Sequence, residues 1–160
     1  MARRFRFRLQ TLLRVRQLRE REAKRKVAAK RAEIARLDRL NEQTTEEILR
    51  QQEALLAGQR QGRLEPLALQ RGRAWIAYLR KTIAVRHLQR MQLVEELHKL
   101  QAEFQAARTQ ARIIERLRER RWDQYVRDRE RRDQAAADEL AQQLHGSEAP
   151  AALSGQLSAS

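Results

Sequence analysis

The 160-residue chain contains no cysteine, two prolines and five glycines, and only 4% of its residues are aromatic. Without cysteine it can form neither disulfide bonds nor thiolate zinc sites. The scarcity of large side chains and of helix breakers argues against a compact globular core and favours long helices. No run of about 18 consecutive apolar residues is present. We therefore expect a soluble, cytoplasmic protein.

The sequence also lacks the short motifs that mark most enzyme classes. It has no glycine-rich phosphate loop, no serine nucleophile elbow and no His-Glu-x-x-His helix. His87, His98 and His145 are too widely separated to form the i,i+4 pair that places two imidazoles on one helical face. We therefore expect no catalytic residues, no metal ligands, no cofactor-binding residues and no cofactor.

Positive charge is concentrated near the start of the chain. The formal net charge is +14, and 13 of the 35 Lys and Arg residues lie between Arg3 and Arg31, opposed only by Glu20 and Glu22. Apolar residues recur through this segment at spacings of three and four, which predicts an amphipathic helix rather than a disordered arm. Such a helix needs a partner, which could be nucleic acid, a membrane surface or another protein.

Two long helical patterns cover most of the chain. We predict a first helix over about residues 5–57, a hinge at 58–65, a second helix over about 66–144 and a disordered tail at 146–160, with one domain spanning 1–145. The first helix carries a seven-residue row: Leu13, Glu20, Val27, Ile34, Asn41, Ile48 and Leu55. The second carries a four-three row: Ile76, Leu79, Ile83, Arg86, Arg90, Leu93, Leu97, Leu100, Phe104, Ala107, Ala111, Ile114, Arg118, Arg121 and Tyr125.

These rows predict an all-α fold in which the two helices form an antiparallel, left-handed coiled coil and the second helix overhangs the first. Folding at the hinge would place Ile34 near Arg90 and Phe5 near Glu119. It would also bring the basic start of the chain beside the Arg-rich stretch around residue 118. The charge would then be polarised toward the end opposite the hinge.

Two apolar seams compete just beyond the hinge. One is Ile76, Leu79 and Ile83, and the other is Trp75, Leu79 and Thr82. A two-stranded coil can bury only one of them, and the other would form an exposed docking surface.

Two sequence blocks resemble the flagellar export protein FliJ family. The first is Phe5-x-Phe7-x-Leu9-x-x-Leu12-Leu13-x-x-Arg16 leading into Glu22-Ala23. The second runs from Ile113 to Arg121 and is followed by Tyr125 and Asp138-Glu139-Leu140-Ala141. The resemblance extends from Phe5 to about Ala141 and includes the length, the position of the hinge and the two-helix plan.

The resemblance implies a non-enzymatic component of the flagellar type III export apparatus, similar to the central stalk of rotary ATP synthases. Its implied partners are the hexameric export ATPase, the large cytoplasmic domain of the export gate and export chaperones, with only peripheral membrane association. Because an Arg-rich end suits an acidic ring lumen, we combine it with the resemblance and predict ATPase binding at Leu12, Leu13, Arg16, Arg118 and Arg121. The resemblance also implies gate-binding residues. It assigns gate binding to Trp75, Leu79, Thr82 and Arg86, although Thr82 and Arg86 match the family pattern poorly.

Two other functions remain open at this point. A basic coiled coil could bind nucleic acid or ribosomes, with an affinity that falls steeply with salt. The stalk of a virulence-type secretion system would share the fold and mechanism. We expect no specific nucleic acid partner, and the Phe-x-Phe-x-Leu start favours the flagellar branch.

Overall fold

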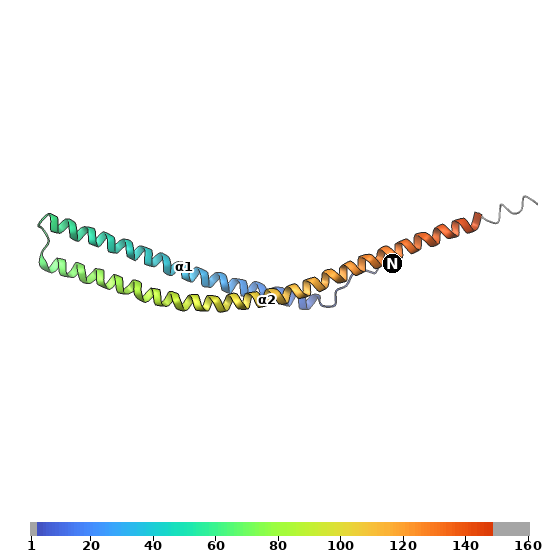
Figure 1. The fold of residues 1–160 in the computed structure, drawn as a ribbon, viewed down its shortest axis with the longest axis horizontal. Helices are drawn as coiled ribbons and strands as arrows, with labels where there is room; N and C mark the ends of the chain where they lie inside the picture. The colour runs from blue at the N-terminus through green and yellow to red at the C-terminus, as the bar shows by residue number, and fades with distance from the viewer. Residues whose placement is uncertain (1–2, 149–160) are drawn as a thin grey trace, which may run out of the picture. The chain divides into compact units, whose positions relative to one another are not determined.

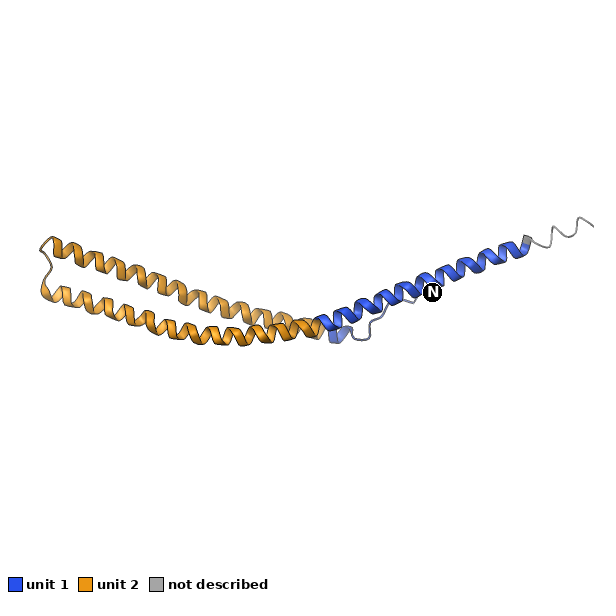
Figure 2. Cartoon of the chain, viewed as in Figure 1, with its two compact units in different colours: residues 1–13, 112–160 blue, residues 14–111 orange. Residues whose placement is uncertain are grey.

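A computed structural model of the chain describes residues 3–148, and these contain two helices and no strand. Helix α1 spans Gln10–Arg60 and helix α2 spans Pro66–Glu148 (Figure 1). The two helices pack against each other as an antiparallel hairpin, which confirms the all-α prediction. The chain divides into two compact units (Figure 2). Unit 1 comprises residues 1–13 and 112–160, and unit 2 comprises residues 14–111.

Gly62 ends α1. It has a φ of +62°, a left-handed conformation that strains residues with a Cβ. The Arg63 amide donates to the Gly58 carbonyl and the Gly62 amide to the Gln59 carbonyl, both at 3.2 Å. This bonding pattern is a Schellman motif. Gly58 itself stays helical, so α1 continues to Arg60 and the connection is 61–65, shorter than the predicted hinge at 58–65.

The start of α2 follows the expected pattern, with Pro66 at the first helical position. The Leu69 amide donates to the Glu65 carbonyl at 3.1 Å. One turn further on, Gly72 allows α1 to approach closely, because a Cβ at this position would lie 2.7 Å from a methyl group of Leu55. A larger residue at this position would require the Leu55 side chain to move.

The beginning of the chain differs from the prediction, because α1 starts at Gln10 rather than near Phe5. Residues 3–7 are irregular and precede a turn at residues 8–9. Phe5 and Phe7 are half-buried, whereas Arg6 and Arg8 are exposed. This alternation is typical of extended backbone. In unit 1 the segment packs along α2, where Phe5 contacts Trp122 and Tyr125. These contacts favour the extended conformation over the helix that the spacing predicts.

Unit 2 contains a narrow core between α1 and α2. Ile48, Ile76 and Leu79 are buried together, and Leu55 and Ile83 pack against them. The predicted seven-residue row on α1 is buried at Val27, Ile34, Asn41 and Ile48. On α2 the predicted four-three row is buried or half-buried from Ile76 to Ala111.

Polar residues of unit 2 bond across this core. Lys30 on α1 lies 2.8 Å from Glu96 on α2, and Arg90 on α2 lies 2.8 Å from Asp38 on α1. Arg16 on α1 donates a hydrogen bond to the Gln110 side chain. The pairing is close to the predicted one, since Ile48 packs with Ile76 and Arg90 pairs with Asp38, one helical turn beyond Ile34.

In unit 1 the predicted four-three row does not continue as a buried seam. Arg118 and Arg121 are exposed, whereas Leu117 and Tyr125 are half-buried. An extended segment rather than a second helix covers α2 here, so four-three packing is not imposed. From Arg127 to Ser147 every residue of α2 is exposed. Residues 146–148 of the expected tail belong to α2, and residues 149–160 lie outside the described part of the chain.

Candidate protein-interaction surfaces

Of the two apolar seams of α2, the one that contains Ile76 is buried against α1. Ile76 and Leu79 are 7% and 8% exposed and face Ile48 of α1, whereas Trp75 is 45% exposed. Trp75 stacks on Tyr78, with ring centroids 5.5 Å apart and an interplanar angle of 21°. The Trp75 side therefore forms an exposed aromatic pair supported by a buried aliphatic seam.

The four predicted gate-binding residues differ in accessibility. Trp75 is exposed, Leu79 is buried and Thr82 is half-buried, with its hydroxyl donating to the Tyr78 carbonyl at 3.0 Å. Arg86 is half-buried and donates to the Thr44 hydroxyl at 2.8 Å. Trp75 is thus the most accessible of the four, while Leu79 and Arg86 hold the hairpin together.

The predicted gate-binding set did not include the exposed residues that continue the Trp75 side. Tyr78 is 59% exposed and Val85 is 46% exposed, and both extend the stripe at spacings of three and four. Leu88 is also exposed nearby. The four-three spacing from Trp75 through Tyr78 and Thr82 to Val85 was the signal that could have identified them.

The predicted ATPase-binding residues are divided between the units. Leu12, Leu13, Arg118 and Arg121 belong to unit 1, and Arg16 belongs to unit 2. Leu13 is 1% exposed, so it serves packing, whereas Leu12 is 37% exposed. Arg118 and Arg121 are both exposed.

Within unit 1, aromatic contacts hold the start of the chain against α2. Phe5 makes an edge-to-face contact with Trp122, with ring centroids 5.1 Å apart, and lies 5.5 Å from Tyr125. The Tyr125 hydroxyl donates to the Arg3 carbonyl at 2.6 Å. Sequence analysis missed this cluster because it treated Phe5 as part of a helix.

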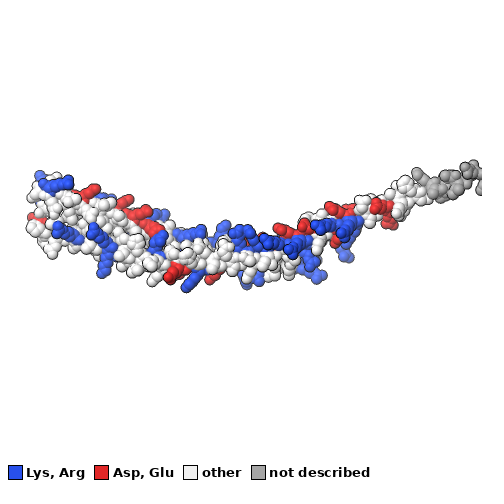
Figure 3. Space-filling view, in the orientation of Figure 1, with Lys and Arg blue, Asp and Glu red and all other residues white. Residues whose placement is uncertain are grey.

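This contact gathers basic side chains around one groove of unit 1. The groove has a volume of about 600 Å³, and its charged lining residues are Arg6, Arg8, Arg121 and Asp128. Three cations and one carboxylate thus line this groove. Figure 3 shows Lys and Arg side chains along both units, with Asp and Glu among them.

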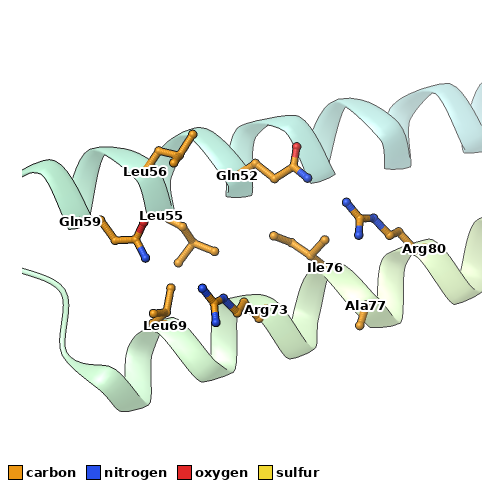
Figure 4. Close-up of a pocket in the computed structure, with 9 residues that line it drawn as sticks. All are labelled: Gln52, Leu55, Leu56, Gln59, Leu69, Arg73, Ile76, Ala77 and Arg80. Carbon is orange, nitrogen blue, oxygen red and sulfur yellow. The ribbon is translucent and has the colours of Figure 1, made fainter.

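A groove of about 440 Å³ opens in unit 2 beside the connection (Figure 4). Leu55 and Ile76 point into the space between the helices, and Arg73 and Arg80 extend from α2 toward α1. Among residues 3–148, no group of three or more His, Asp or Glu side chains could hold a metal ion. No helix in this range is long and apolar enough to cross a membrane.

The described residues thus form a two-helix hairpin with an exposed aromatic pair in unit 2 and a groove lined by Arg side chains in unit 1. The chain matches the family described as Flagellar FliJ protein over residues 5–149, and it belongs to this family. It is therefore a component of the flagellar export apparatus, in a family whose members are non-enzymatic. No curated protein and no solved structure matched the chain.

Proposed function

We propose that the protein is a cytoplasmic stalk of the flagellar export apparatus, which binds the hexameric export ATPase, links it to the export gate and assists the cycling of export chaperones. Its association with the membrane is peripheral, through the apparatus. Membership of the family supports the place of the protein in the flagellar export apparatus. The observation that carries the stalk role is the exposed surface of unit 1, where Leu12 is accessible and Arg118 and Arg121 are exposed.

The chemistry of this surface suits an acidic partner surface. Residues 112–133 contain nine Arg against six Asp and Glu, and the Arg3–Arg8 segment adds four more cations. When a partner excludes water, charge pairs strengthen and guanidinium groups bind carboxylates in a bidentate geometry. Leu13 is buried, so we assign it a packing role rather than a direct contact with the ATPase.

The ATPase contact can be tested by capture of the full chain on the immobilised export ATPase. Arg118→Glu with Arg121→Glu should reduce capture at least about tenfold, because like charges at a desolvated contact cost several kcal/mol. Arg25→Glu with Arg39→Glu is the matched control, since it makes the same charge change at exposed positions of unit 2. Equal capture of both double variants contradicts the assignment.

The gate contact is tested on the exposed aromatic pair. Trp75→Ala with Tyr78→Ala removes exposed rings and leaves the Ile48, Ile76 and Leu79 core intact. We expect binding to the cytoplasmic domain of the gate to be lost while the melting temperature changes little. Leu79→Ala is a less selective variant because it also opens a cavity in the core. Unchanged gate binding in the Trp75 and Tyr78 variant contradicts this part of the proposal.

A further inference from the structure

Unit 2 has grooves on both sides of its helix pair, and the two sides differ in charge. On the side that continues the Trp75 stripe, a groove of about 400 Å³ is lined by Glu33 and Glu96 as well as Arg36. On the opposite side, two grooves of about 440 and 490 Å³ have no acidic lining residue. The acidic lining residues of these three grooves therefore all belong to one groove, and between the two acid-free grooves α1 carries Asp38 and Glu42.

The two acid-free grooves open along a single row of α2, which we call the basic row. Its members recur at spacings of four and three: Arg73, Ala77, Arg80, Ala84, His87, Met91, Val94, His98, Gln101, Gln105 and Arg108. Arg73, Ala77 and Arg80 line the first groove, and Gln101 and Gln105 line the second. The row contains no Asp or Glu over its whole length.

The cations along these grooves have no ion pair within residues 3–148. On α2 these are Arg73 and Arg80 in the first groove, and α1 contributes Lys24 and Arg31 to the second. Arg108, which ends the basic row, has no ion pair in this range either. This contrasts with Lys30 and Arg90 of the same unit, which pair across the core. The charges along the basic row are therefore available to a partner.

Apolar and small side chains lie between these charges. Met91 is 65% exposed and Leu56, at the rim of the first groove, is 51% exposed. Ala77 lines the first groove, and Ala28 and Ala102 line the second. Protruding side chains beside small ones allow another helix to pack closely.

The geometry points to one occupant: an amphipathic helix with acidic flanks, supplied by a partner protein and laid along the basic row as a third helix. The four-three spacing matches the spacing with which α1 and α2 pack on each other. Arg73 and Arg108 are 35 residues apart on one helix, about 50 Å. A partner helix of about that length spans both grooves, with its carboxylates opposite the unpaired cations.

Nucleic acid fits this side of the hairpin less well. Single-strand binding surfaces stack bases on exposed aromatic side chains. The basic row has none, and Phe104, which lines the second groove, is half-buried. The exposed Trp75 and Tyr78 belong to the opposite side of α2. A second copy of the chain is disfavoured by its net charge of +14. The surface is also separate from the aromatic pair assigned to the gate.

The test measures binding of the full-length chain to a synthetic amphipathic helix of about 35 residues, with leucine on one face, glutamate on both flanks and glutamine elsewhere. A second peptide carries lysine in place of glutamate, and an oligothymidylate strand represents nucleic acid. The protein variants are Arg73→Glu with Arg80→Glu, Ala77→Trp, and Arg25→Glu with Arg39→Glu as the charge-matched control. Circular dichroism verifies that each variant keeps its helices.

We expect the acidic peptide to bind and the lysine peptide not to bind. Arg73→Glu with Arg80→Glu should weaken binding at least about tenfold more than the control does. Ala77→Trp should weaken it as well, because the indole fills the groove without changing the charge. Equal losses in both double variants, or no effect of Ala77→Trp, would show non-specific attraction and overturn the proposal. Oligothymidylate binding that exceeds peptide binding would also overturn it.

Discussion

Arg86 on α2 donates a hydrogen bond of 2.8 Å to the hydroxyl of Thr44 on α1. The same guanidinium donates to the Leu40 carbonyl at 3.3 Å. Arg86 occupies a core position of the four-three row, where a charged residue is unfavourable unless its donors are satisfied. These two bonds direct its charge to polar atoms at the edge of the core.

A structural role for Arg86 predicts energetic coupling to Thr44. Arg86→Met and Thr44→Val should each destabilise the hairpin, and the double variant should lose less than the sum of the two. We expect a coupling of about 1 kcal/mol, the usual net value of one hydrogen bond. Urea unfolding followed by circular dichroism measures the cycle. Additive losses would show that the hydrogen bond contributes nothing to stability.

Asn41 should weaken the hairpin that contains it. It is 8% exposed, and neither its amide nitrogen nor its amide oxygen has a hydrogen-bond partner within residues 3–148. Burying an amide without partners costs free energy, and an apolar side chain of similar size avoids that cost. Asn41→Leu should raise the unfolding free energy by about 1–2 kcal/mol.

The matched variant is Asn41→Asp, which should destabilise the hairpin because it places a charge at the same position. Both effects are measured by urea unfolding at neutral pH. If Asn41→Leu instead lowers stability, the amide is satisfied in solution and this explanation fails. A buried polar residue can also fix the register of a coiled coil. Amide exchange of wild type and Asn41→Leu therefore tests whether the variant still packs in one register.

Much of unit 2 could be predicted from the sequence, because burial in a long hairpin selects a regular period. Val27, Ile34 and Ile48 are buried at the predicted spacing of seven. The hinge was located by its glycines and Pro66, although only the backbone angle of Gly62 shows which glycine ends α1. The choice between Ile76 and Trp75 needed the structure, because both fit a helical repeat and only packing against Ile48 separates them.

The start of the chain could not be predicted by the same reasoning. Phe5, Leu9 and Leu12 fit a helical spacing, while Phe5, Phe7 and Leu9 fit an alternation of two, which is typical of extended structure. The contacts of Phe5 with Trp122 and Tyr125, more than a hundred residues away in sequence, select the second pattern. The accessibility of candidate site residues such as Leu13 and Arg86 likewise depends on packing that sequence does not reveal.

The docked N-terminal segment makes a prediction of its own. Phe5→Ala removes the ring that contacts Trp122 and Tyr125, so the Arg3–Arg8 segment should detach from α2. Trypsin cleavage after Arg6 and Arg8 should become several-fold faster, because proteases cut undocked chain.

The milder variant Tyr125→Phe loses only the hydrogen bond to the Arg3 carbonyl and should give a smaller increase in cleavage. Cleavage rates are measured by mass spectrometry at short digestion times. The melting temperature should hardly change in either variant, since unit 2 is untouched. Identical cleavage of wild type and Phe5→Ala would mean that the aromatic contacts do not hold the segment.

Lys30 should make the stability of the hairpin sensitive to alkaline pH. Its ammonium lies 2.8 Å from Glu96 on α2 and 3.3 Å from Glu33 on α1. The hydrogen bond to Glu96, aided by Glu33, raises the pKa of Lys30 above its ordinary value of 10.5 in the folded chain, although desolvation opposes this. The folded state therefore holds this proton more tightly than the unfolded state. The associated stability is fully present below pH 10.5 and is lost as pH rises through the raised pKa.

The difference in unfolding free energy between wild type and Lys30→Gln should be constant near neutral pH and should shrink at alkaline pH. Urea unfolding over about pH 9–12 measures it. Lys81→Gln is the control, because Lys81 is exposed and has no ion pair within residues 3–148. Comparison of the two variants separates the contribution of the Lys30 contact from the effect of replacing any exposed lysine. A Lys30→Gln difference that grows with rising pH would have the opposite sign and would show that desolvation of Lys30 outweighs its pairing with Glu96.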